Sequence, residues 1–128
     1  MKHSPFFYLV FSIALGTGGC ATTSPTQSMA RARVDSAQVA YSAGDYARTI
    51  SLLGHAPEID SANADTRIEA HKLLAFSYCV TNRVALCRSE FAKILDINPR
   101  FELTAAERGH PVWGPAFEFV RHKRMAAS

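Results

Sequence analysis

The chain has 128 residues and a formal net charge of +3 at pH 7, and 48% of its residues are hydrophobic. That length supports one compact domain, because two hydrophobic cores usually need more chain. The mild charge gives no strong electrostatic case for a nucleic-acid partner, so membrane and protein partners are the classes to weigh.

Residues 1–19 have the pattern of a secretory signal peptide. Lys2 and His3 form a short basic head, residues 6–15 form a nearly unbroken apolar run, and small residues lead to Gly19. The apolar run is shorter than the ~20 residues that a helix needs to cross a bilayer. The pattern therefore indicates export followed by removal of residues 1–19.

The end of this segment, Gly18-Gly19-Cys20-Ala21, resembles the lipobox of bacterial lipoproteins, although Thr17 stands where these proteins usually have Leu. The resemblance implies that Cys20 is acylated and becomes the mature first residue. It also implies sorting to the outer membrane, since Ala rather than Asp follows the cysteine. The alternative is a buried N-terminal helix with an incidental cysteine. Residues 20–30 are rich in Thr, Ser and Gln, a composition that predicts a flexible tether.

Residues 31–56 are predicted to form a first pair of antiparallel helices. Val34, Ala37 and Tyr41 recur at the spacing of one helix face. Gly44 interrupts this pattern, as a residue suited to a helix C-terminus does. A second helix with its own apolar face then follows.

Residues 66–98 are predicted to form a second pair. Leu74 and Tyr78 share a helix face, residues 81–83 break the pattern, and a further helix follows. Pro99 ends it, because the residue before a proline is driven out of helical geometry.

Both pairs resemble the tetratricopeptide repeat. The first carries a matching turn, Tyr41-Ser-Ala-Gly-Asp-Tyr46. In the second, the repeat's small, aromatic and proline positions are filled by His71, Leu74, Ala75, Tyr78, Cys87, Phe91, Ile94 and Pro99. Small residues let antiparallel helices approach, and aromatic side chains fill the flanking gaps. The resemblance implies an all-α fold of about two repeats. The alternative is a generic bundle of helical hairpins.

Residues 104–124 are predicted to cap this array. Thr104 and Glu107 have the spacing of a capping box, and Gly114-Pro115 is suited to open a last helix. The basic tail, residues 121–124, could contact anionic lipid or peptidoglycan, or could be a solvated helix end. The residues expected to pack the cap against the second pair are Phe101, Leu103, Val112, Trp113 and Phe117.

The whole chain is similar to the small tetratricopeptide-repeat lipoproteins encoded with bacterial type VI secretion systems, the TssQ-like family. The lipobox carries this resemblance together with Tyr78-Cys79, Cys87, Phe91 and the run from Asn98 to Pro115. It implies a non-enzymatic adaptor on the periplasmic face of the outer membrane that binds a protein in a secretion assembly. A pilotin-like or peptidoglycan-machinery scaffold is the alternative. Nucleic acid is not an expected partner, and no oligomeric state is predicted.

Cys79 and Cys87 remain as an even pair in an oxidising compartment, on opposite sides of the second predicted turn. A disulfide there would clamp the second hairpin, and the alternative is two buried free thiols. A thiol-active periplasmic enzyme is the rival function, but the chain has no Cys-x-x-Cys motif. The histidines stand at no metal-ligand spacing, and phosphate-loop and nucleophile-elbow motifs are missing. No catalytic, cofactor-binding or metal-binding residue is therefore predicted, apart from the covalent lipid on Cys20.

The resemblance to tetratricopeptide repeats implies a partner groove on the inner face of the first helix of each pair. Exposed Tyr and Phe with basic neighbours are the usual anchors of such a site. The alternative is that two repeats make too shallow a groove, so that Phe76 and Val80 belong to the core. The groove positions are Arg31, Val34, Gln38 and Tyr41 in the first pair and Glu69, Lys72, Phe76 and Val80 in the second.

Overall fold

The structure, a computed structural model, describes residue 19 and residues 22–128. Most of the predicted signal peptide and the predicted lipidation site Cys20 lie outside the described residues. The described part contains no strand, which confirms the prediction of an all-α fold. Its seven helices are α1 (Pro25–Ser42), α2 (Tyr46–Leu53), α3 (Pro57–Asp60), α4 (Ala64–Val80), α5 (Val84–Ile97), α6 (Ala105–Arg108) and α7 (Trp113–Ala127).

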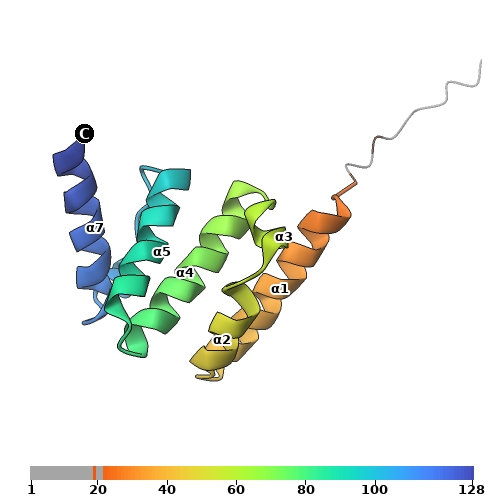
Figure 1. Ribbon diagram of the computed structural model, residues 1–128, viewed down its shortest axis with the longest axis horizontal. Coiled ribbons are helices and arrows are strands. Elements are labelled where there is room, and N and C mark those ends of the chain that lie inside the picture. The colour runs from red at the N-terminus through yellow and green to blue at the C-terminus, as the bar shows by residue number, and fades with distance from the viewer. Residues whose placement is uncertain (1–18, 20–21) are drawn as a thin grey trace, which may run out of the picture.

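The longer helices stack in one row (Figure 1). α1 packs on α2 and α4 packs on α5, and a short turn joins the two helices of each pair. α2 then contacts α4, and α5 contacts α7. α7 thus packs against the second pair in the same way as α4 packs against the first pair.

The turns within the two pairs have the same backbone conformation. Gly44 has a φ of 76° and Asn82 a φ of 64°, in the left-handed region that favours Gly and tolerates Asn. In both turns the next residue's N–H donates to the carbonyl five residues back, at 2.9 Å in the first and 2.8 Å in the second. This hydrogen bond is characteristic of the Schellman motif at a helix C-terminus.

Side-chain caps fix where several helices begin. At four helix starts, the capping oxygen accepts the backbone N–H of the third residue along, which would otherwise lack an acceptor. Glu107 also accepts the backbone N–H of Thr104 at 2.9 Å, which confirms the predicted capping box. The four capping residues are Ser24, Asp45, Asn63 and Thr104.

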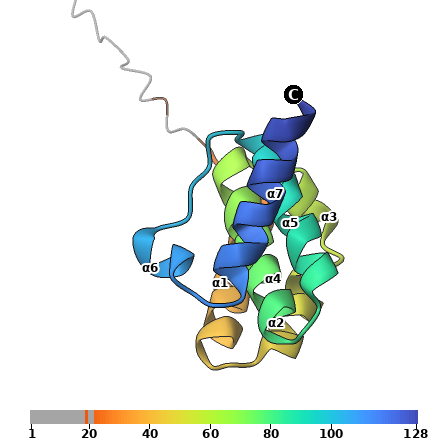
Figure 2. The ribbon, with the colours of Figure 1, turned by 90° about the vertical axis from the view of Figure 1, so that its left-hand side faces the viewer.

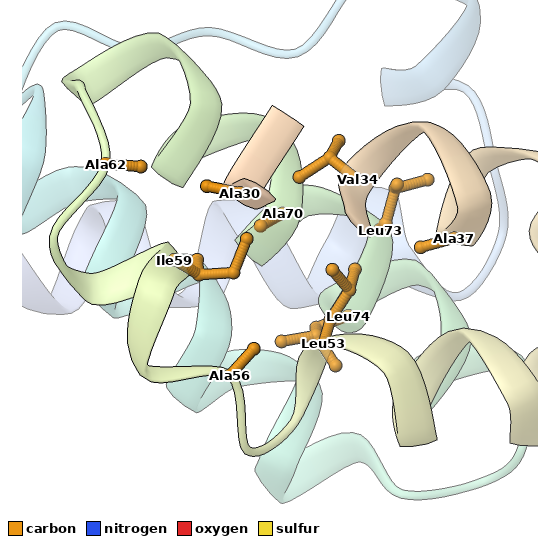
Figure 3. Packing of buried hydrophobic residues seen from close by; sticks show 10 residues of the cluster. All are labelled: Ala30, Val34, Ala37, Leu53, Ala56, Ile59, Ala62, Ala70, Leu73 and Leu74. Carbon is orange, nitrogen blue, oxygen red and sulfur yellow. The ribbon is translucent and has the colours of Figure 1, made fainter. Parts of the chain in front are cut away.

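The first hydrophobic cluster joins α1, α2, α3 and α4 (Figure 3). Ala30, Ala37 and Ala70 are fully buried, and their small size lets α1 and α4 approach each other closely. Leu53 and Ile59 fill the space toward α2 and α3. A compact set of Ala and Leu side chains therefore fixes the first pair against α4.

The second cluster is aromatic and joins α4, α5 and α7. The Phe91 ring lies at its centre, with ring centroids of Phe76 and Phe117 at 6.2 and 5.3 Å in edge-to-face geometry. Phe101 meets Phe117 edge-on at 5.9 Å. Of the predicted cap residues, Leu103 and Phe117 are buried, Phe101 and Trp113 are half-buried in this cluster, and Val112 is exposed.

The prediction of a flexible tether over residues 20–30 is wrong from Pro25 onward, because α1 begins there. The Ser24 cap and a proline in the first turn start the helix. The Gln27 side chain then donates to Thr66 Oγ1 at 2.9 Å and accepts the Asn63 N–H at 2.8 Å. These contacts with α4 and its cap hold the first turn in place, and the composition of the segment does not reveal them.

Two other element boundaries differ from the prediction. The short helix α3 lies between the pairs, and Ile59 anchors it in the first cluster. A single apolar residue gives no periodicity from which such a helix could be predicted. The last helix begins at Trp113, one residue before the predicted Gly114-Pro115 opening.

Candidate partner-binding surface

The inner faces of α1 and α4 carry the predicted groove, and the fold brings these two faces together. Arg31 of α1 donates two hydrogen bonds to the carboxylate of Glu69 on α4, at 2.6 and 3.0 Å. A second pair of groove residues, Tyr41 and Phe76, lies with ring centroids 6.2 Å apart. The predicted groove residues of the two helix pairs thus meet where α1 contacts α4.

Two of the predicted groove residues are not accessible to a partner. Val34 is fully buried and Phe76 is only 4% exposed. The indole of Trp113 stacks on the Phe76 ring at a centroid distance of 4.1 Å, and His110 stacks on Trp113 at 3.3 Å. The prediction that Val34 and Phe76 bind a partner is therefore wrong, because the chain's own C-terminal segment covers Phe76 and the core encloses Val34.

The covering segment is fixed by polar contacts as well. Lys72, another predicted groove residue, donates to Glu107 at 2.8 Å, and the Trp113 indole N–H donates to the Glu107 carbonyl at 2.7 Å. Burial alone would raise the pKa of Glu107, but hydrogen bonds from Lys72 and Thr104 outweigh it and hold that pKa below its ordinary value. Figure 2 shows α6, which carries Glu107, to one side of the helix stack.

Part of the inner face stays accessible. Gln38 is exposed, and Tyr41 and Val80 are partly buried. Burial raises the pKa of the Tyr41 hydroxyl to about 12, so this phenol is a neutral hydrogen-bonding group at physiological pH. The open surface is accordingly smaller and more polar than the predicted groove.

Cys79 and Cys87 form a disulfide between the end of α4 and the first turn of α5. Their Cα atoms lie 5.2 Å apart across the turn at Asn82. Both cysteines are buried. Neither sulfur is thus a free, accessible thiolate of the kind that thiol chemistry requires.

A polar cluster lies between α4 and α5, in which His71 and Glu90 are buried and Lys93 is exposed. Nδ1 of His71 lies 2.7 Å from a carboxylate oxygen of Glu90, and Lys93 donates to the other oxygen at 2.8 Å. These side chains form one wall of a cleft of about 350 Å³ whose other walls include His55 and Asp60. Within residues 22–128, no group of three or more potential metal-ligating side chains comes together. The His71–Glu90 contact links α4 to α5, and Lys93 pairs with Glu90 within α5.

This cluster predicts a loss of stability in acid. Burial would raise the pKa of Glu90, but hydrogen bonds from His71 and Lys93 outweigh it and lower that pKa. Such a carboxyl contributes stability in full above its unfolded pKa of about 4.3, and the contribution is lost as the pH falls through the lower folded value. Glu90→Gln should therefore reduce the drop in melting temperature between about pH 6 and about pH 3, as followed by circular dichroism.

Asp65→Asn is the control for this experiment, because Asp65 is an exposed carboxyl at the start of α4. It should retain a pH dependence close to that of the unsubstituted protein. An unchanged pH dependence in the Glu90→Gln variant would show that the buried pair does not contribute to acid sensitivity.

A second surface, which the sequence pattern does not predict, lies between α5 and α7. It is a groove of about 530 Å³ with Phe119 as its largest apolar side chain. The guanidinium of Arg88 lies over the Phe119 ring, 3.9 Å from its centroid. Phe119 is nonetheless 48% exposed. The only sequence signal for this groove is an aromatic residue outside the buried face of the last helix, next to the basic tail.

No protein-family model, curated protein or solved structure matches the chain. Among the described helices, none combines the length and the apolar character that a bilayer span requires.

Proposed function

We propose that the protein is a lipid-anchored adaptor on the periplasmic face of the outer membrane, where its helical domain binds a protein partner. We further propose that the partner belongs to an envelope or secretion assembly, with type VI secretion as the system that the sequence resemblance favours. The observation that carries the proposal is the short separation in sequence between Cys20, in the lipobox-like motif, and the first helix of a stacked-helix domain.

The repeated helix pair supports the tetratricopeptide-like part of this proposal. Gly44 and Asn82, 38 residues apart in the sequence, have the same left-handed conformation and the same Schellman hydrogen bond. α4 packs on the first pair as α7 packs on the second. Stacked helical hairpins of this kind build extended surfaces that bind other proteins, and they need no catalytic group.

The early start of α1 changes how the anchor would work. Only residues 21–24 separate Cys20 from Pro25, and a chain of that length spans at most ~18 Å when fully extended. A lipid on Cys20 would therefore hold the N-terminal end of α1 close to the bilayer surface. The anchor would raise the local concentration of the domain near membrane-bound partners rather than give it a long reach.

Removal of the predicted lipidation site tests the proposal. Cys20→Ala should release the protein from the membrane fraction into the soluble periplasm, since acyl chains hold it there. Ala21→Asp is the matched control for sorting, because the resemblance to lipoproteins implies that Asp after the cysteine retains the protein in the inner membrane. Fractionation followed by immunoblotting measures both. A Cys20→Ala variant that stays in the membrane fraction would refute the anchoring.

A further inference from the structure

The groove between α5 and α7 lacks a covering helix in the described part of the chain. Phe119 lies in it at about half exposure, beside Val120 of α7 and Ala85 and Ala92 of α5. Most of the solvent-accessible lining is apolar. An apolar strip of this size between two helices is a characteristic place for a further helix to dock.

The stacking order of the helices also indicates that a further helix would occupy this groove. α4 packs on α2, and its own partner helix α5 follows and completes the pair. α7 packs on α5 in the corresponding way, but no described helix pairs with α7 as α5 pairs with α4. Within residues 22–128, the groove thus has α5 and α7 as its walls and no helix across it.

The charges along the groove define which helix it would accept. Arg88, Lys123 and Arg124 line it, and no carboxylate does so within the described chain. Arg124 also pairs with Asp96 at 2.5 Å, whereas the Nε of Arg88 is buried without a hydrogen bond. Cationic side chains beside an apolar strip complement a helix with one apolar face flanked by Asp or Glu.

We propose that this groove binds an acidic amphipathic helix of a protein partner, with Phe119 as the central contact. A second copy of the chain is a poorer occupant, because its own last helix is basic. The proposal rests on the adaptor role argued above and assigns the surface through which that role is performed.

Site-specific photocrosslinking in membranes tests partner binding at the groove independently of the adaptor role. A benzophenone amino acid replaces Phe119 in the full chain, and in a second strain it replaces Gln38 on the inner face of α1. Crosslinks from position 119 to an acidic helical segment of another protein, mapped by mass spectrometry, are the expected result. Crosslinks from position 38 alone would overturn the groove assignment and keep the adaptor role. Protein crosslinks from neither position would count against both.

Designed peptides test the chemistry directly. One helical peptide carries Leu at positions i, i+3, i+4 and i+7 with flanking Glu, and its counterpart carries Lys in place of Glu. We expect the full chain, purified in detergent, to bind the acidic peptide at least tenfold more tightly by fluorescence anisotropy. Phe119→Ala and Lys123→Glu should each weaken that binding about tenfold, whereas Val39→Ala and Arg48→Glu, exposed positions on α1 and α2, should not change it.

Four results would overturn the proposal. The first two are equal binding of the two peptides and no binding of either. The others are binding that survives both groove substitutions and a concentration-dependent dimer that Lys123→Glu abolishes. The dimer would mean that a second copy occupies the groove. Phe119→Ala should keep the circular dichroism spectrum of the unsubstituted protein, which distinguishes a lost contact from a lost fold.

Discussion

Replacement of Phe117 by Ala should destabilise the domain more than any surface substitution, by about 3–5 kcal/mol. The Phe117 side chain is fully buried, and its ring meets Phe91 and Phe101 edge-on. Its loss leaves a cavity in the aromatic cluster that joins α4, α5 and α7. Urea unfolding followed by circular dichroism measures the change in unfolding free energy.

Phe119→Ala is the matched control, since it removes the same side chain two residues further along α7 from a half-exposed position. It should cost less than about 1 kcal/mol, because about half of the side-chain surface is already in contact with water. Equal losses for Phe117→Ala and Phe119→Ala would contradict the packing of α7 on the second pair.

Removal of the Cys79–Cys87 bond should lower the unfolding free energy by about 2–3 kcal/mol. The bond closes a loop of sequence separation 8 and therefore restricts the unfolded chain. Replacement of both cysteines by Ser also places two hydroxyls at buried positions, so reduction of the unsubstituted protein with dithiothreitol is the cleaner measurement. Denaturant unfolding under oxidising and reducing conditions gives the difference.

The double variant Cys79→Ser/Cys87→Ser serves as the internal control. Its unfolding midpoint should not respond to dithiothreitol, whereas that of the unsubstituted protein should fall. An unsubstituted protein with the same midpoint under both conditions, and two thiols that titrate after unfolding without reductant, would show that the cysteines are not bonded.

The turns within the two helix pairs and the capping box could be predicted from the sequence because local interactions set them. Gly44 and the polar residues around Asn82 mark the turns, and the spacing of Thr104 and Glu107 marks a capping box. Each of these signals depends on residues no more than five positions apart. Backbone geometry and helix capping act over that range, so no knowledge of the tertiary structure was needed.

The partner groove could not be predicted reliably because its accessibility depends on residues far away in the chain. Phe76 has the position of a groove anchor in a tetratricopeptide repeat, but Trp113 stacks on it. Gln27 lies in a segment whose composition predicts a tether, but its side chain forms a hydrogen bond with Thr66 on another helix. The groove beside Phe119 depends likewise on how α5 and α7 meet. Periodicity alone contains none of these long-range contacts.

If lipid on Cys20 holds a helical binding domain at the membrane, the mature chain must carry that lipid. Mass spectrometry of the intact protein extracted from membranes tests it most directly. We predict a mature chain that begins at Cys20 and carries covalently bound acyl chains, with residues 1–19 removed. A chain that retains residues 1–19, or one with an unmodified Cys20, would contradict this claim.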